Sequence, residues 1–468
     1  MLPPASQACI GDITDERTRL IERYGGGGLD ISAASEYLRE LPHARFASLA
    51  YQRPRERPYI QPRGGFPSVA KQRTLTLAFD QAGADFIPLT IDSHTRHNDY
   101  ETATSLLAAG LAEERDLLNG YPLVSHGVES TRGLFEGIER PVSLRHGTPD
   151  ARLLAEIALA SGITEIEGGG LSYTLPYSRG FPLERALAHW QYVDRLCAVI
   201  GPADAPVHRE SFGPLTATLV PPLITAVVQL CELLLAAEQG VTSFAVSFGQ
   251  TGSFEQDIAL AGVLRRMSAE LLARFGFPDL RVSLVYHQWM GAFPTEASLA
   301  WQLIAVAAAV SRLAGADKVV VKTPEEALGI PSIDSNVAAV RAVRYVLDMF
   351  PDATAVANEM IDEERDLIGS EVEHVLEHVF AQPFTTLLSS VHQAVLTGAI
   401  DVPFAPHEQN AGRLIAGRGA GRRIRILDPA AVPISVDDLR REQRLRGERT
   451  PEQGPLWERL MRDIRILA

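Results

Sequence analysis

Short apolar runs alternate with longer amphipathic segments along most of the chain, from about residue 55 to about residue 350. The short runs are rich in β-branched and aromatic residues, which favour strands, and the longer segments carry residues typical of helix ends. Alternation at this spacing is typical of βα units around a parallel sheet. Nine runs qualify as strands, and they end at Arg63, Asp92, His126, Arg145, Glu167, Glu210, Phe248, Gln288 and Lys322.

The polar residues at the ends of these runs indicate which kind of parallel sheet the chain forms. An open, doubly wound sheet gathers such residues at one switch point, whereas a closed barrel brings the ends of all its strands to one face. Here they are spread over most of the runs, which favours a (β/α)8 TIM-type barrel and leaves the open sheet as the alternative. Such a barrel holds eight strands, so one of the nine is wrong or lies on the rim.

Several of the predicted helices have recognisable ends. Thr148, Pro149 and Asp150 predict a helix start, and Gly162 predicts the end of that helix. Capping boxes are predicted at Ser253 with Gln256, before residues 257–275, and at Thr323 with Glu326. Gly83 and Gly120 are predicted to end two further helices.

The two flanks of the barrel region differ from it in pattern. Residues 1–54 contain a glycine run at 25–28 and an amphipathic stretch at 33–41, which predicts an N-terminal arm that holds one helix. The catalytic barrel is predicted over 55–384, and residues 385–468 are predicted to form a smaller C-terminal α+β domain. That domain is expected to contain a solvated basic hairpin turn at 417–423, for which phosphate or cofactor contact is the alternative, a strand at 424–427, a polar helix at 436–446 and a last helix.

The composition is that of a packed, water-soluble protein. Of the 468 residues 46% are hydrophobic, and the formal net charge of -14 argues against nucleic acid or an anionic membrane as the main partner. The three cysteines are widely spaced, which fits a reducing cytoplasm and excludes a disulfide scaffold. Residues 1–10 show no signal-peptide pattern. The most apolar run, 215–237, is interrupted by polar residues, so we expect a buried helix that begins near Pro222 rather than a membrane span.

Three arginines and one glutamate lie where predicted strands end. Arg63, Arg96 and Arg145 follow three apolar runs, and Glu167 follows a fourth. In a barrel the four side chains would meet in one cavity, where the arginines suit a dianion and the carboxylate suits an ammonium. A dicarboxylic amino acid is the simplest molecule that fits. The alternative is that each arginine pairs with a neighbouring acid and holds the rim together.

Glycines and tyrosines follow Glu167. Residues 168–170 are all glycine, and they predict either a tight turn or a mouth cleared of side chains. Tyr173 and Tyr177 are spaced to face the same mouth, although both could equally be packing aromatics. The role of Lys322 and Glu326 depends on whether they reach that mouth, because a capping box alone would account for Glu326.

A catalytic metal is the competing hypothesis for this face. Six histidines lie at or just past predicted strand ends: His94, His97, His126, His146, His208 and His287. However, neither H-x-H nor H-E-x-x-H occurs, and three of these histidines lie within two residues of Arg96 or Arg145. Because cations repel a metal ion, we expect no metal site.

Eight stretches of the chain carry a resemblance to a known family: residues 61–67, 89–98, 118–124, 144–154, 167–177, 209–215, 287–294 and 321–331. They closely resemble the family of the large (epsilon) subunit of glutamate mutase, also called methylaspartate mutase E chain. The resemblance implies an adenosylcobalamin-dependent isomerase that interconverts L-glutamate and threo-3-methyl-L-aspartate by radical fragmentation and recombination. Each fragment would keep one carboxylate and therefore one arginine anchor.

The resemblance also implies roles for individual residues. Arg63, Arg96 and Arg145 would bind the substrate carboxylates, and the catalytic Glu167 would bind the amino group. The substrate pocket would be completed by His146, Tyr173 and Tyr177. The cofactor would be lined by Gly65, Asn119, Pro176, Phe293, Lys322, Glu326 and Ile330. Glu325 replaces a histidine expected in some relatives.

The cobalt-ligating motif D-x-H-x-x-G of cobalamin-binding domains is absent from this chain. The nearest stretch, 92–97, ends in histidine where the motif has glycine. The resemblance therefore implies a separate small (sigma) subunit that ligates cobalt, in a heterotetramer with a dimer of this chain, and an isolated chain that is inactive. Two alternatives remain: a cobalamin-independent barrel isomerase or lyase that acts on an acidic amino acid, and a non-catalytic assembly subunit.

Overall fold

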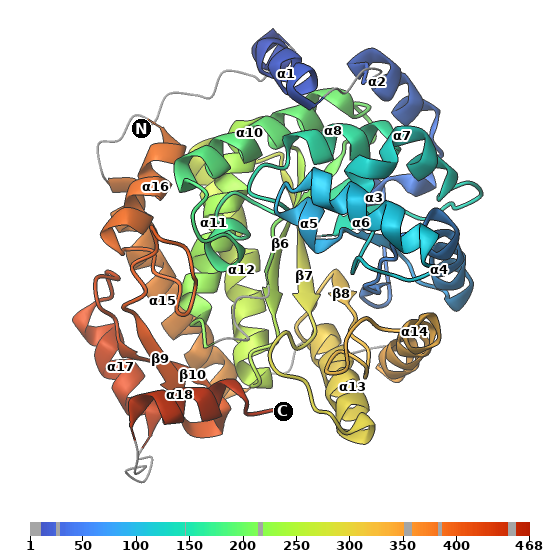
Figure 1. Ribbon diagram of the computed structural model, residues 1–468. Helices are drawn as coiled ribbons and strands as arrows, with labels where there is room; N and C mark the ends of the chain where they lie inside the picture. Colours follow the sequence, from blue (N-terminus) through green and yellow to red (C-terminus); the bar gives the residue numbers. More distant parts are fainter. Residues whose placement is uncertain are drawn as a thin grey trace.

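Eight parallel strands form the centre of the structure, with helices around them (Figure 1). The computed structural model describes residues 11–24, 29–145, 147–213, 219–350, 358–381, 386–447 and 455–468. From β2 to β8 each strand pairs with the next strand in sequence, and β1 pairs with β8, in the order β1-β8-β7-β6-β5-β4-β3-β2. The strands are β1 (Tyr59–Gln61), β2 (Ile87–Thr90), β3 (Val142–Arg145), β4 (Glu165–Glu167), β5 (His208–Glu210), β6 (Ser243–Gly249), β7 (Arg281–His287) and β8 (Lys318–Val320).

Strands β1 and β2 stand at the two ends of this order, and backbone hydrogen bonds between their segments close the barrel. The amides of Asp85 and Phe86 donate to the Ile60 carbonyl at 2.9 and 3.3 Å, and the Thr90 amide donates to the Gly64 carbonyl at 3.2 Å. The prediction of a (β/α)8 barrel is therefore confirmed, and the open sheet is excluded.

The ninth predicted strand, which was to end at His126, is wrong. Leu123–Gly133 form helix α7, and Tyr121 makes only an isolated bridge with Ile91. Gly120 does not end a helix either, because α6 (Tyr100–Ala112) ends earlier. Gly120 instead lies against the end of β2, where a Cβ atom would be 2.6 Å from the Asp92 amide nitrogen. The apolar run is buried by this close approach and not by a sheet ladder.

The helices that cover the barrel follow the strands in sequence. They are α4 (Val69–Ala82), α6, α7, α8 (Arg152–Ala160), α10 (Leu183–Ile200), α11 (Pro222–Glu238), α12 (Phe254–Phe275), α13 (Ala297–Leu313) and α14 (Ile333–Asp348). Helix α11 begins at Pro222, as predicted, and its residues from Pro222 to Ala237 are buried because α10, α12, α15 and α16 surround it. Among the described residues, no helix has the length and apolar character needed to cross a membrane.

Helix ends were predicted with mixed success. Gly83 ends α4 with φ +83°, and Gly162 follows α8 with φ +80°, as expected. Helix α8 begins only at Arg152, because the Asp150 carboxylate binds the Arg152 guanidinium at 2.7 and 2.8 Å instead of capping a helix start at Thr148.

The two predicted capping boxes do not form. Helix α12 begins at Phe254, but the Ser253 hydroxyl donates to Glu255. The Gln256 amide instead binds the backbone of Ile424, donating at 3.0 Å and accepting at 2.9 Å. The residues after Thr323 form turns rather than a helix.

The N-terminal segment covers one side and the base of the barrel. It contains α1 (Gly11–Tyr24), the predicted helix α2 (Ile31–Glu40), η1 (His43–Arg45) and α3 (Ala47–Gln52), while the glycine run at 25–28 lies outside the described residues. Helices α1 and α2 contact α8 and α10. The α3 residue Tyr51 packs against Phe86 with ring centroids 5.4 Å apart, at the end of the barrel where the strands begin.

The C-terminal segment packs on α11 and α12 (Figure 1). It contains α15 (Glu359–Ala381), α16 (Leu387–Thr397), the antiparallel hairpin β9 (Ile415–Arg418) and β10 (Ile424–Asp428) with η3 (Ala420–Arg422), α17 (Val436–Arg446) and α18 (Leu456–Ile464). The predicted strand and polar helix are therefore confirmed. The basic turn is not simply solvated, because Arg418 is only 2% exposed and donates from Nε to the Asp463 carbonyl at 2.9 Å. The boundaries at 54/55 and 384/385 stay predictions.

Candidate active site

Arg145 lies inside the barrel at the end of β3, where it is 1% exposed. Its Nη1 donates to Glu210 at 2.8 Å, and its Nη2 forms an ion pair with Glu167. Burial alone would lower the pKa of Arg145, but the two carboxylates outweigh burial and raise it. For this arginine, pairing with neighbouring acids is therefore what the structure shows, and one of these acids is the predicted Glu167.

Five charged residues form a connected set in the barrel interior, here named the barrel charge network: Arg145, Glu165, Glu167, Glu210 and Lys318. Because alternate strand residues face the same side, Glu165 and Glu167 occupy two successive levels of the interior. Lys318 Nζ lies 2.8 Å from Glu165 and 2.6 Å from Glu210, so it connects the two levels. All five side chains are at most 1% exposed.

Sequence reasoning missed Glu165 and Lys318 and gave Glu210 no role. A signal was present, because the tripeptides of β4 (Glu-Ile-Glu) and β5 (His-Arg-Glu) place an ionisable side chain at both the first and the third position of a buried strand. In a barrel, residues at every second position of a strand face the same side, so the first and third positions can both face the interior.

The environment of each group sets its protonation. Burial raises the pKa of Glu165. Burial acts in the same direction on Glu210, but the cations Arg145 and Lys318 outweigh it and hold the pKa of Glu210 well below its usual range. Burial lowers the pKa of His208 to about 3 and that of His287 to about 4, so both imidazoles are neutral near pH 7.

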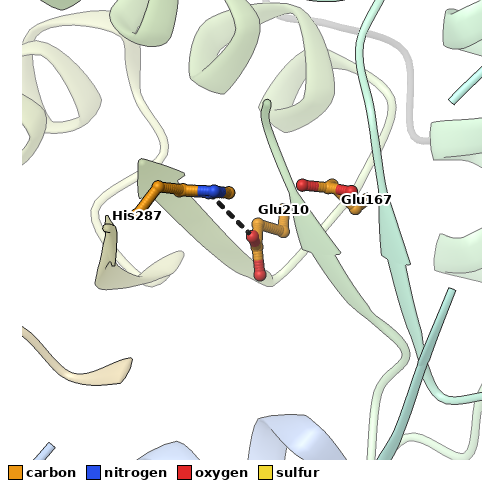
Figure 2. Close-up of side chains that lie close together, drawn as sticks. All are labelled: Glu167, Glu210 and His287. Carbon is orange, nitrogen blue, oxygen red and sulfur yellow. Dashed lines mark ion pairs between the residues drawn. The ribbon is translucent and has the colours of Figure 1, made fainter. Parts of the chain in front are cut away.

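One group of side chains in this set has the composition of a metal site. Glu167, Glu210 and His287 offer ligand atoms within 4.8 Å of one another, and they lie at the ends of β4, β5 and β7 (Figure 2). The His287 Nε2 lies 3.7 Å from Glu210. Arg145, however, already contacts both carboxylates, and its positive charge opposes a metal ion at this position.

Most of the other histidines that were considered as ligands have local partners. His94 lies 3.4 Å from Asp99, the His97 ring contacts the Ser93 carbonyl at 2.6 Å, and the His126 ring contacts the Pro67 carbonyl at 2.7 Å. His146 lies outside the described residues.

The two predicted tyrosines form an aromatic rim above the network. Short helix α9 (Thr174–Tyr177) stacks the Tyr173 and Tyr177 rings at 4.9 Å, and Phe212 meets them edge-on at 5.8 and 5.3 Å. Tyr173 is buried, whereas Tyr177 is 43% exposed. The aromatic rim therefore leads from the protein surface towards the buried charges.

The other two predicted arginines lie beside this rim. Arg96, at the end of α5 (Ser93–Arg96), lies against Tyr173. Burial raises the pKa of Tyr173 to about 12, and the charge of Arg96 acts in the opposite direction. After burial, the groups that act on the pKa of Tyr177 are Arg63, Glu167 and Arg96. The structure thus brings together the three arginines, Glu167 and both tyrosines, as the sequence predicted.

The glycines after Glu167, for which either a tight turn or a cleared mouth was predicted, lie against the surrounding helices. A Cβ atom on Gly169 would lie 2.2 Å from Glu232 of α11, and one on Gly170 would lie 2.8 Å from the Leu187 backbone of α10. Gly168 has φ +135°, a conformation that favours glycine. These glycines permit close packing against the surrounding helices and do not clear the mouth.

The residues predicted to line a cofactor lie in the loops around the same face. The Lys322 ammonium binds Glu326 at 2.5 Å, and burial, followed by the charge of Arg63, lowers the pKa of Lys322 to about 8. Arg63 also contacts Met290 through Nη1 at 3.3 Å. This group therefore adjoins the arginine side of the site, and a functional role for Lys322 and Glu326 stays a prediction.

The remaining predicted cofactor residues differ in exposure. Asn119 is exposed and accepts from the Ser93 amide at 2.9 Å, Ile330 is 49% exposed, and Phe293 is 8% exposed. A Cβ atom on Gly65 would lie 2.3 Å from the Thr90 carbonyl oxygen, so close approach of two strand ends already requires glycine there. Pro176 lies within α9, and contact of these residues with a cofactor stays a prediction.

Comparison with known proteins identifies close relatives over nearly the full length. The family model described as methylaspartate mutase E chain matches residues 41–455. A glutamate mutase epsilon subunit from Desulfitobacterium hafniense is 37% identical over 455 residues, which cover 96% of this chain and 94% of the relative. Proteins of the same description from Treponema denticola and Yersinia enterocolitica are 38% and 40% identical, over 92% and 87% of this chain and 89% and 85% of theirs.

Proposed function

The chain belongs to the methylaspartate mutase E chain family, and from this premise we propose that it is the large catalytic subunit of an adenosylcobalamin-dependent glutamate mutase. The reaction is the interconversion of L-glutamate and threo-3-methyl-L-aspartate by fragmentation and recombination. The observation that carries the proposal is the convergence of three arginines on Glu167 and the tyrosine rim at the carboxyl end of the barrel.

Charge supports a doubly anionic amino acid as the substrate. Around the proposed substrate position lie the cations Arg63, Arg96 and Arg145 and the carboxylates of Glu167 and Glu210, a surplus of one positive charge. L-Glutamate carries a net charge of −1. The substrate ammonium would bind Glu167, and a substrate carboxylate would bind Arg145. The internal ion pair between Arg145 and Glu167 would thus be replaced by two ion pairs with the ligand.

The arrangement suits a reaction in which the substrate divides into two parts. When bound, adenosylcobalamin supplies a carbon radical that removes hydrogen from the substrate. This chain's residues then have to hold both fragments in register. Separate arginines permit this, because each fragment keeps one carboxylate. Tyr173 and Phe212 limit the access of water from the rim.

The donor groups at this face fit a cofactor that is carried by a second subunit. Lys322 and Glu326 would bind polar groups of the adenosyl part, and the exposed Ile330 would pack on it. A cobalt ligand is a different matter. His94 belongs to α5, which also carries Arg96, and His97 directly follows this helix; both rings have local partners. The small sigma subunit would therefore supply the ligand, in a heterotetramer with two copies of each chain.

A reconstitution experiment tests the proposal. Purified chain, a small cobalamin-binding subunit and adenosylcobalamin are mixed anaerobically with threo-3-methyl-L-aspartate, and L-glutamate is followed by NMR. Glutamate is expected only in the complete mixture. Conversion without corrinoid or partner would instead establish the cobalamin-independent isomerase or lyase, and no conversion with a verified partner would overturn the proposal.

A non-catalytic assembly subunit is distinguished by one variant. Glu167→Gln should leave binding of the small subunit unchanged and abolish most of the turnover. Full turnover in this variant would show that Glu167 has no catalytic role, contrary to the proposal.

A further inference from the structure

The lower level of the barrel charge network, Glu165 and Lys318, lies beneath the proposed substrate residues and contacts no part of the proposed substrate. Lys318 binds both oxygens of Glu165 at 2.8 and 2.9 Å. The Tyr51 hydroxyl donates to Glu165 at 3.3 Å, and Phe86 lies 4.8 Å from the Lys318 ammonium. Aromatic side chains thus close this level from below, where the low dielectric strengthens each ion pair.

Glu210 connects this lower level to Arg145. Its Oε1 accepts from Arg145 Nη1 at 2.8 Å, and its Oε2 accepts from Lys318 Nζ at 2.6 Å. Because the two carboxylate oxygens are held by different cations, the carboxylate plane is fixed. Lys318, Glu210 and Arg145 form a chain of ion pairs that begins deep in the barrel and ends at Glu167.

An apolar interior would be the simpler solution for stability. The same barrel contains an apolar cluster of Ala245, Val285 and Val320. Replacing a buried ion pair by well-packed apolar residues is often neutral or stabilising, so the presence of this network is not explained by stability alone. Apolar residues in place of Glu210 and Lys318 could not hold the Arg145 guanidinium in a fixed orientation.

We propose that Glu210 and Lys318 are positioning residues of the mutase reaction. Glu210 holds one end of the Arg145 guanidinium, and Lys318 holds Glu210, so that the rest of the guanidinium and the Glu167 carboxylate meet a substrate carboxylate and the ammonium. The Nε of Arg145, which is buried and has no hydrogen-bond partner among the described residues, is one donor kept for the ligand. This inference rests on the proposed function.

The test compares two ligands on the reconstituted mutase. L-Glutamate provides kcat and KM, and glutarate, which keeps both carboxylates but lacks the ammonium, provides an inhibition constant. Glu210→Gln is expected to raise KM for L-glutamate and the inhibition constant of glutarate by about 10- to 150-fold each, which corresponds to the loss of one charged hydrogen bond. Glu167→Gln should raise the constant for L-glutamate and leave that for glutarate near the wild-type value. Unchanged constants in Glu210→Gln would overturn the inference.

A double variant separates positioning from charge balance at Lys318. Lys318→Met leaves both Glu165 and Glu210 without their lysine, and adding Glu165→Gln removes the unpaired lower carboxylate. Substrate binding should remain weak in the double variant, because Glu210 is still untethered. Full recovery would mean that Lys318 only neutralises Glu165 and would overturn its positioning role.

Two controls keep the outcomes distinct. Glu210→Asp retains the charge but shortens the side chain, and it should also weaken both ligands, so it carries the test if Glu210→Gln does not fold. Wild-type constants in Glu210→Asp would contradict a positioning role. The wild-type complex is measured alongside, and if it shows no turnover with a verified partner, the proposed function fails before any variant is considered.

Discussion

In the part of the chain that the structure describes, two regions bury an arginine between carboxylates, and only one of these regions has the features of an active site. In the barrel charge network, Arg145 contacts Glu167 and Glu210. In the C-terminal segment, Arg425 of β10 contacts Glu364 of α15 and lies 3.9 Å from Glu442 of α17. We name the second group, together with Glu371 of α15, the C-terminal charge cluster.

The chemical composition of the two regions does not distinguish them. Arg145 and Arg425 are each 1% exposed, and the Nε of each has no hydrogen-bond partner among the described residues. A buried ion pair with an unsatisfied donor is therefore not in itself a sign of catalysis.

The surroundings of the two regions do distinguish them. The barrel network continues upward to a rim with a partly exposed Tyr177 and two more arginines. The C-terminal charge cluster is enclosed on the barrel side by Gln256, which donates to Glu364 at 3.3 Å and to the Ile424 carbonyl at 3.0 Å. A role in chemistry follows from access to a ligand at the carboxyl end of the barrel.

Arg425→Met gives the largest effect and acts on stability. The substitution leaves Glu442 without its arginine and leaves Glu364 with only Arg423, at 3.5 Å, which costs up to about 3 to 5 kcal/mol. We expect the free energy of unfolding in urea to fall by this amount, while kcat of the reconstituted mutase at 20 °C stays at the wild-type value. A loss of turnover in folded protein would remove the distinction between the two regions.

Glu167→Gln is the matching change in the barrel and acts on activity. It removes a charged hydrogen bond to the substrate ammonium, worth about 1.5 to 3 kcal/mol, so kcat/KM should fall by about 10- to 150-fold. The thermal midpoint should change little, because Arg145 keeps Glu210 as a partner. Glu364→Gln is the control, with a lowered midpoint and normal kcat/KM.

The sequence predicted those parts of the fold and site that depend on local signals. Pro222 starts α11, residues 424–427 form most of β10, and Arg145 and Glu167 end neighbouring strands. The strand expected before His126 was wrong, because an apolar run can also be buried beneath a close loop contact.

Two features of the interior could not be read from the chain. The ion pair of Lys318 with Glu165 joins residues 153 positions apart and depends on the closure of the barrel. The packing of the glycines at 168–170 against α10 and α11 depends on where those helices lie, which no local pattern specifies.

A pH-dependent loss of stability should belong to the C-terminal charge cluster. Burial raises the pKa of Glu442 from an ordinary 4.5 to about 7, and burial with the nearby Glu442 raises the pKa of Glu371 well above its usual range. Between pH 4.5 and about 7, the folded state therefore binds more protons at these two residues than the unfolded state does. The stabilisation is therefore complete below about pH 4.5 and is lost as the pH rises through about 7.

The Glu371→Gln variant measures this contribution. Urea unfolding at pH 5, 6, 7 and 8 should give a shallower decline than in the wild type, by about 1 to 3 kcal/mol over the range, since one pKa unit is worth about 1.4 kcal/mol. The dependence of kcat on pH should be the same in both proteins. An unchanged stability profile would show that this acid pair does not titrate in the window.

Tyr177→Phe gives the smallest effect and tests the rim itself. Its hydroxyl can reach a ligand because the side chain is 43% exposed and lies among charges that include Arg63 and Glu167. Loss of one hydrogen bond, about 0.5 to 1.5 kcal/mol, should raise KM for L-glutamate by about 2- to 12-fold without moving the thermal midpoint. Tyr286→Phe is the control: the Tyr286 hydroxyl is fully buried and donates to Asp257 at 2.8 Å, so this variant should lose stability and keep its KM. If both variants raised KM alike, access from the rim could not be what separates a binding hydroxyl from a structural one, and the contrast between the two charge regions would lose its physical basis.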